Sequence, residues 1–178
     1  MDIVFNNFRI TTLDTNEDEK FFYLIDRNRD RLEDFFAGTV SKTKTLHDTT
    51  IYCQNIRDRV LKKSYFPFII SDLRANTFIG LIDVKNIDWN IPKAEIGYFI
   101  DAYYEGQGVI SKSLGLVIEH LSETYQFKKL LCRANSSNIG SIAVAKKNGF
   151  VLEGTIKKDY KTTRGEIVDL DYYGRVFS

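Results

Sequence analysis

Asp101-Ala-Tyr-Tyr-Glu-Gly-Gln-Gly-Val-Ile-Ser111 is the most informative stretch of this sequence. It follows the apolar, β-rich residues 96–100 and precedes apolar residues at helical spacing, so it predicts a strand, a loop and a helix. Gly106 and Gly108 allow positive φ angles and the close approach of a ligand. The N–H groups of residues 107–111 would be unpaired at a helix start with partial positive charge. The stretch therefore predicts an anion site, with phosphate as the favoured ligand.

Two better-known phosphate loops do not match this stretch. A P-loop requires Lys-Ser/Thr directly after its last glycine, whereas Val109-Ile110 follow Gly108. The dinucleotide fingerprint requires a third small residue and an acid at the end of the next strand, where Ser111 and Asn135 stand instead. On this loop alone, a purely structural tight turn stays open as the alternative.

Length and composition predict one globular domain over residues 1–178. The chain is 43% hydrophobic and 13% aromatic, values that allow a buried core without extended disorder. A net charge of +1 provides no general field for nucleic acid or an anionic membrane. No run approaches the roughly 18 apolar residues that a membrane span requires, and the first residues lack a basic region. We therefore expect a cytoplasmic protein with neither nucleic acid nor membrane as a partner.

The cysteines and histidines are few and scattered. Cys53 and Cys132 lie far apart in apolar surroundings, which predicts reduced packing residues and no disulfide. His47 and His120 offer no metal-ligand spacing, so no metal is expected. The sequence also has no Gly-x-Ser-x-Gly nucleophile elbow for which His120 could act as the base, which excludes a serine hydrolase of that type.

The remaining segments predict an α/β fold, a single-domain mixed sheet of about seven strands flanked by helices. Strands are expected at residues 8–12, 65–72, 77–88, 94–100 and 129–134, with a closing hairpin of 150–153 and 156–161 against 167–177. Helices are expected from caps at Asp14-Thr15-Asn16 to Phe36, over 45–63 with Ile51, Ile56, Val60 and Leu61 inward, after the glycine loop, and over 139–148 with Gly149 as a left-handed cap.

The first two of these helices could form a wall of a substrate cleft. The charged run of residues 26–31 interleaves both signs, so we interpret it as a solvated helix face in preference to a binding patch.

Glu95 is a candidate general base on the strand before the loop. Alternation places it on one strand face with Gly97 and Phe99. Burial in a mostly apolar strand would raise the pKa of this carboxyl toward neutrality, which suits a base. An exposed or ion-paired glutamate is the equally weighted alternative.

Asn135-Ser-Ser-Asn-Ile-Gly-Ser141 is the second candidate site and joins a strand to a helix. Asn138 and Ser141 could place a cap and a hydroxyl beside the glycine loop, although simple N-capping accounts for them as well. Lys146 and Lys147 could contact phosphates or face water.

Taken together, these motifs resemble the GNAT superfamily of N-acetyltransferases, most closely its ribosomal-protein N-terminal acetyltransferase (Rim-type) group. The resemblance rests on four pieces in the order and spacing of that family, and it is strongest over residues 80–154. The pieces are Ala94-Glu-Ile-Gly-Tyr-Phe-Ile100, Tyr104-Glu-Gly-Gln-Gly-Val-Ile110, Asn138-Ile-Gly-Ser141 and Lys147-Asn-Gly-Phe-Val-Leu-Glu-Gly154.

The resemblance implies acetyl-CoA as cosubstrate. Its pyrophosphate would lie on the glycine loop, and its pantetheine arm would lie between the preceding strand and a splayed parallel neighbour. The residues implied for this site are Phe99, Ile100, Asp101, Gly106, Gln107, Gly108, Val109, Ile110, Ser111, Asn138 and Lys146.

Three positions depart from the family pattern. Tyr103 stands where Gln or Arg is frequent, Ala145 where many relatives carry a tyrosine acid, and Arg133 where some carry a glutamate base. Glu95 then remains as the base, directly or through water, and Ser141 as the candidate acid for the departing thiolate.

The function implied by the resemblance is acetyl transfer from acetyl-CoA to a primary amine, either a protein N-terminus or a small amine, by direct attack in a ternary complex. Main-chain N–H groups near Phe99 or Ile100 would polarise the thioester carbonyl. The alternative from another class is a non-catalytic acyl-CoA-binding or partner-binding module that keeps the fold. A homodimer is left open as the assembly.

Overall fold

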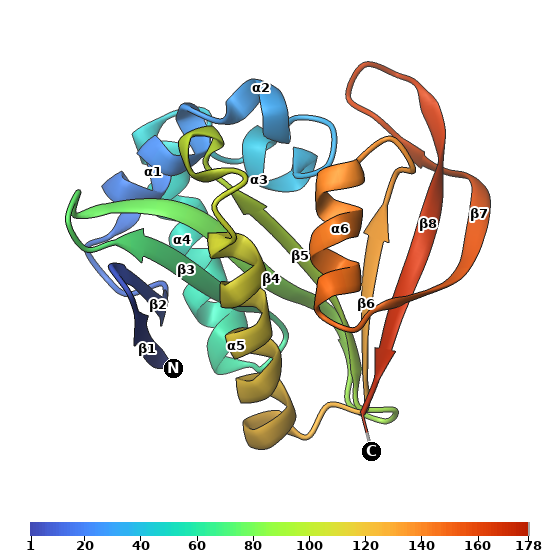
Figure 1. The fold of residues 1–178 in the computed structure, drawn as a ribbon. Coiled ribbons are helices and arrows are strands. Elements are labelled where there is room, and N and C mark those ends of the chain that lie inside the picture. Colours follow the sequence, from blue (N-terminus) through green and yellow to red (C-terminus); the bar gives the residue numbers. More distant parts are fainter. Residues whose placement is uncertain (178) are drawn as a thin grey trace.

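The computed structural model describes residues 1–177, in which one mixed sheet carries eight strands in the order β1-β2-β3-β4-β5-β6-β8-β7 (Figure 1). Ser178, the last residue of the expected domain, lies outside the described residues. The strands are β1 (Asp2–Phe5), β2 (Phe8–Thr12), β3 (Phe66–Asp72), β4 (Thr77–Asp88), β5 (Lys93–Ile100), β6 (Lys129–Ala134), β7 (Val151–Lys161) and β8 (Ile167–Val176).

Six helices and one short 3₁₀ turn cover the sheet of the described chain. They are α1 (Asp18–Asp26), α2 (Arg29–Leu32), α3 (Ala37–Ser41), α4 (Leu46–Leu61), η1 (Ala102–Tyr104), α5 (Val109–Tyr125) and α6 (Ile139–Lys147). Helices α5 and α6 lie on one face of the sheet and α1 to α4 on the other (Figure 1).

The parallel pair β5–β6 divides the sheet. Its strands pair at Lys93–Lys129, Ala94–Leu130 and Glu95–Leu131 and then separate, while all other neighbouring strands of the described chain pair antiparallel. Backbone groups beyond Glu95 therefore face an opening in the sheet, because no strand completes the ladder there. The predicted splay is confirmed.

Two apolar cores hold the helices to the sheet. On β5 alternate residues are buried, as the period of a strand requires. The buried set, which packs against α5, is Ala94, Ile96, Tyr98 and Ile100. The opposite core contains Phe21, Leu24 and Ile25 of α1 with Ile56 of α4. Glu95, Gly97 and Phe99 point to that second side, as predicted.

The N-terminal region differs most from the sequence-based expectation. Strand β1 was not predicted, because it is short and half exposed, so the sheet has eight strands instead of about seven.

The helix expected to reach Phe36 is broken after Asp26. At the break the Asn28 side chain donates to the Leu24 carbonyl oxygen and to Asp101, and side-chain bonds of this kind compete with helix continuation. The cap position is Glu17, without a side-chain hydrogen bond, so the predicted Asp14-Thr15-Asn16 cap is wrong.

Helix α4 matches its predicted bounds but not its predicted inner face. Leu61 is 83% exposed and Ile51 52% exposed. The buried residues are Thr49, Cys53 and Ile56, which recur at the spacing of one helical face. Thr49 is tolerated there because its hydroxyl donates to the Thr45 carbonyl oxygen.

The remaining predicted elements are present. Gly149 closes α6 at φ +78°, and the closing hairpin forms from β7 and β8, although β7 is one strand with two register shifts. Both cysteines are unpaired and buried. Among residues 1–177 no helix is both long and apolar enough to cross a bilayer.

Candidate functional site

A cavity of about 790 Å³ occupies the opening between β5 and β6. It continues to both faces of the sheet. On the α5–α6 side its lining includes Gly106, Gly108 and Ser111 of the glycine loop and the start of α6; on the other side it includes Glu95 and Arg133. A volume of this order suits a small-molecule ligand.

The glycine loop presents a row of backbone donors. Gly106 and Gly108 have φ of +71° and +76°, and a Cβ at either position would lie in open space. The N–H groups of residues 106–111 donate to no acceptor within residues 1–177, since they precede or open α5. Unpaired N–H groups at a helix start form an anion site. The loop therefore has the unpaired donors and the open space that an anionic group requires.

The start of α6 faces the same cavity. Asn138 caps this helix: its Oδ1 accepts from the Ser141 N–H at 3.1 Å. The Ser141 hydroxyl makes no hydrogen bond to another described residue and the residue lines the cavity, so this hydroxyl is available to a ligand. Asn138 is therefore the N-cap of α6, as simple N-capping predicts. Simple N-capping does not explain why the Ser141 hydroxyl lies at the cavity.

Tyr98 joins β5 to α6 beside this hydroxyl. Its Oη donates to the Ser141 carbonyl oxygen at 2.6 Å, and Cys132 Sγ lies 3.7 Å from the same Oη. Burial raises the pKa of Tyr98 well above its ordinary value and that of Cys132 to about 11. Both groups are therefore neutral near pH 7, and Tyr98 serves as a fixed link between the two elements that border the cavity.

Glu95 lies at the point where β5 and β6 separate. Arg133 Nη2 is 3.0 Å from its Oε2, Asn86 Nδ2 donates to Oε2 at 2.9 Å, and Lys85 Nζ is 3.8 Å from Oε1. Of the two alternatives weighed for Glu95, the structure shows the ion-paired one and not the apolar surroundings, because Arg133 reaches it from β6. These donors contact both carboxylate oxygens and hold the group at the edge of the cavity.

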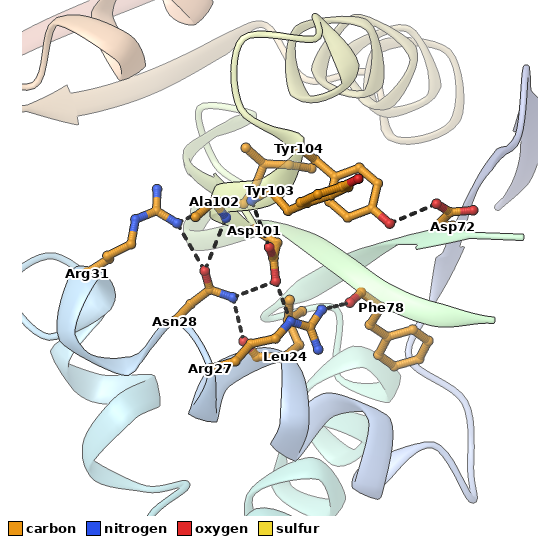
Figure 2. Close-up of polar contacts among 11 residues, drawn as sticks. Leu24, Arg27, Asn28, Arg31, Asp72, Phe78, Asp101, Ala102, Tyr103 and Tyr104 are labelled. Carbon is orange, nitrogen blue, oxygen red and sulfur yellow. Dashed lines mark hydrogen bonds and ion pairs between the residues drawn. The ribbon is translucent and has the colours of Figure 1, made fainter. Parts of the chain in front are cut away.

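Asp101 is part of a buried network behind the glycine loop (Figure 2). Its carboxylate accepts hydrogen bonds from the Arg27 side chain, from Asn28 Nδ2 and from the Tyr103 N–H. Asn28 Oδ1 in turn accepts from the Ala102 N–H and from Arg31. Burial by itself raises the pKa of Asp101, but these bonds, that of Arg27 first, hold it below its usual range. The network ties α1 and α2 to the segment that leads into the loop.

The structure gathers most of the predicted site residues at one cavity. Those that line it are Glu95, Phe99, Ile100, Gly106, Gly108, Ile110, Ser111, Asn138 and Ser141. Those that do not are Asp101, Gln107, Val109 and Lys146. Val109 is buried in the α5 core, and Lys147 lines the cavity where Lys146 was expected.

The resemblance placed the backbone partners of the pantetheine arm at residues 99–101, and strand pairing leaves Ile100 of these free toward the opening. The Asp101 N–H donates to the Ile79 carbonyl oxygen of the β4 side. Because an antiparallel ladder alternates, the backbone of Ile100 and of Tyr98 faces away from β4 and toward the opening, while that of Phe99 and Asp101 faces β4.

Sequence reasoning missed the wall on the Glu95 side. This wall consists of Arg31, Leu32, Phe35, Phe36, Tyr160 and Leu170. Arg31 belongs to the run interpreted as a solvated face, yet it lines the cavity and pairs with Glu105. The apolar residues come from segments more than a hundred positions apart, and no local pattern reveals that they meet.

The sequence matches the family model described as "Acetyltransferase (GNAT) domain" over residues 8–151. The chain belongs to the GNAT acetyltransferase family. The putative ribosomal N-acetyltransferase YdaF of Bacillus subtilis is 30% identical over 166 residues, which are 92% of this chain and 88% of that protein. The ribosomal-protein-serine acetyltransferase of Escherichia coli is 34% identical over 85 residues, so that match spans about half of each protein, 48%.

Solved structures agree on the GNAT fold. The ribosomal-protein-S5-alanine acetyltransferase of Vibrio fischeri superposes with a TM-score of 0.90 at 17% identity, over 99% of this chain and 96% of that chain. RimL, a ribosomal L7/L12 α-N-protein acetyltransferase solved with coenzyme A, has a TM-score of 0.90 at 22% identity, over 98% and 97%. The predicted GNAT fold and the predicted class of enzyme, an acyltransferase that moves acetyl groups to amines, are confirmed.

Proposed function

We propose that this GNAT acetyltransferase uses acetyl-CoA to acetylate a primary amine, either the N-terminus of a protein, as its ribosomal relatives are named for, or a small amine. One observation carries the proposal. A single cavity has unpaired N–H donors at one end and a carboxylate anion at the other, with the opening between β5 and β6 joining them.

The cosubstrate would extend from the glycine loop into the opening. Its pyrophosphate would accept hydrogen bonds from the N–H groups of residues 106–111, with Lys147 close enough to the cavity to add positive charge. The pantetheine amides would pair with the backbone of Tyr98 and Ile100, where β6 has separated from β5 and offers no hydrogen-bond partner. Asn138 would lie beside this arm.

In the transfer step, the acceptor nitrogen forms a bond with the acetyl carbon, and the bond from that carbon to the CoA sulfur breaks. Glu95 takes the proton that the nitrogen loses, directly or through a water molecule. The departing thiolate takes a proton through the Ser141 hydroxyl, which regains one from solvent, and CoA leaves as the thiol. Holding both substrates in one cavity supplies much of the rate, since orientation is worth about 7–11 kcal/mol.

We also propose that residues 1–178 act as one domain in the cytoplasm. The two unpaired cysteines support that compartment, because thiols stay reduced there. The absence of a metal from the reaction stays a prediction. Among residues 1–177 no three His, Cys, Asp or Glu side chains are placed to bind one.

The test is release of free CoA thiol from acetyl-CoA in the presence of peptides and small amines, with mass spectrometry of the acceptor. The expected result is release that depends on the amine and yields a product heavier by one acetyl group. Tight CoA binding with no amine-dependent release would favour the non-catalytic module instead.

A further inference from the structure

The wall of the cavity on the Glu95 side is largely apolar and aromatic. It is built from the end of α2 with the loop that follows, from β5, and from the β7–β8 hairpin. Arg31 lines the same side and pairs with Glu105. We call the apolar and aromatic residues of this side the acceptor wall: Leu32, Phe35, Phe36, Phe99, Tyr160 and Leu170. Because the glycine loop opens on the other side of the sheet, an acceptor reaches Glu95 along this wall.

The acceptor wall is preorganised by contacts between distant segments. The rings of Phe35 and Tyr160 stack with centroids 6.0 Å apart, and those of Phe36 and Phe99 meet edge to face at 5.1 Å. Tyr160 Oη donates to the carbonyl oxygen of Asp34, which is 126 positions away, and Thr163 Oγ1 donates to Asp34 Oδ1 at 3.0 Å. A wall fixed in this way binds a side chain without first being ordered.

Part of this wall is left uncovered at the cavity. Phe35 remains 40% exposed although it stacks on Tyr160, while Leu32 and Leu170 of the same wall are 4% exposed. An aromatic face that borders a cavity and stays open gains free energy when an apolar group covers it.

The charges beside the acceptor wall disfavour a polycation. Among the described residues, two carboxylates line the cavity, and both are already paired. Arg133 and Lys85 contact Glu95, and Arg31 pairs with Glu105. Lys85 Nζ also lies 5.5 Å from the centre of the Phe36 ring. A second or third ammonium group on the acceptor would meet these cations and no free acid.

We propose that the acceptor is a primary amine with an apolar side chain on the adjacent carbon, as at a peptide N-terminus that begins with an aromatic or large aliphatic residue. The inference rests on the proposed function and names its substrate class. The amine reaches Glu95 while the apolar side chain covers Phe35 and Tyr160. Polyamines are poor acceptors because their additional ammonium groups would meet Arg133 and Lys85 beside Glu95.

The test compares acceptors that differ only in their first residue. Peptides of one sequence that begin with Phe, Leu, Ser or Asp are acetylated by the full chain, alongside spermidine. Covering an apolar side chain with this wall is expected to raise kcat/KM for Phe and Leu about 10- to 100-fold over Ser and Asp. Equal rates for all four peptides, or spermidine as the best acceptor, would overturn the inference.

Two variants connect the preference to the wall. Phe35→Ala is expected to reduce the Leu-to-Ser ratio of kcat/KM at least 5-fold, by the order of magnitude that one hydrophobic contact contributes, with the KM for acetyl-CoA unchanged. Tyr23→Ala is the control, because Tyr23 is an exposed aromatic residue of α1 that does not line the cavity. A Leu-to-Ser ratio that survives in a folded Phe35→Ala protein refutes the role of the wall.

Tyr160→Phe separates support of the wall from contact with the acceptor. This change removes the hydrogen bond to Asp34 and keeps the ring. The Leu-to-Ser ratio of kcat/KM should therefore stay within about 3-fold of the wild-type value. A larger loss of this ratio would show that the ring does not carry the preference by itself. Failure of the proposed function looks different, since no acceptor of the panel would then release CoA thiol. Acetylation of the peptides without a preference overturns this inference alone.

Discussion

Glu95 and Arg133 form an ion pair across the point where β5 and β6 part, with Arg133 Nη2 3.0 Å from Glu95 Oε2. Both side chains line the cavity, and Glu95 is only 14% exposed. An acid that is held by a cation in a partly buried site keeps a fixed position. Arg133 contacts both oxygens of the Glu95 carboxylate, so the pair fixes the position of this carboxylate in the cavity.

Replacing Glu95 with Gln is expected to lower kcat about 10²- to 10⁴-fold, the range for loss of a general base. The dissociation constant for acetyl-CoA should change little, because the amide keeps the shape of the carboxylate and the glycine loop is untouched. Steady-state kinetics and calorimetry measure the two quantities. Glu153→Gln is the matched control, since Glu153 pairs with Lys129 outside the cavity. Full turnover in Glu95→Gln would assign the base to another group.

Gly108→Val is expected to weaken acetyl-CoA binding more than 10-fold, a loss of about 1.4 kcal/mol or more. The new side chain would stand in the open space beside the loop, and φ of +76° is unfavourable for it. Calorimetry on folded protein measures the effect. Gly38→Val serves as the control, because Gly38 also has open space around it and lies in α3. Unchanged affinity would remove the pyrophosphate from this loop.

Ser141→Ala and Asn138→Ala are expected to act on different quantities. Ser141→Ala should slow the chemical step about 10- to 150-fold, the equivalent of roughly 1.5–3 kcal/mol for a hydrogen bond to developing charge, with the melting temperature retained. Asn138→Ala should lower the stability by about 1 kcal/mol, because it removes the cap of α6. Single-turnover rates and thermal melts on the same preparations check both. Wild-type turnover in Ser141→Ala would make water the proton donor.

The acid sensitivity of the fold is expected to depend on Asp101. Its pKa is lowered in the folded protein, so its hydrogen bonds contribute stability above the unfolded value of about 3.9, and this contribution is lost as the pH falls through the lower folded pKa. Asp101→Asn should therefore be less stable at pH 7 and lose less stability between pH 5 and pH 2.5 than the wild type. Urea titrations at these pH values measure the difference.

The control for this prediction is Asp30→Asn, which changes an exposed acid of α2. It should leave the pH profile of stability unchanged. If Asp101→Asn has the same profile as the wild type, the network in Figure 2 does not stabilise the fold through this carboxylate.

The sequence by itself determined the local elements and the row of unpaired N–H groups at the glycine loop. The strand, loop and helix around Gly106 and Gly108 follow from residue spacing and from the freedom of glycine, and the structure has them where they were expected. Capping at Asn138 and Gly149 is equally local. These features are readable because their causes lie within a few neighbouring residues.

Tertiary structure decided the surroundings of Glu95 and the acceptor wall. Arg133 reaches Glu95 only because β6 pairs with β5 in one register, and Tyr160 meets Phe35 only because the β7–β8 hairpin folds back over the loop after α2. Distant segments also decide which side of α4 is exposed, because they determine which of its residues are buried. The helix break at Asn28 depends likewise on its hydrogen bond to Asp101, 73 positions away. Strand register and long-range packing are properties of pairs of segments, and periodicity within either segment does not contain them.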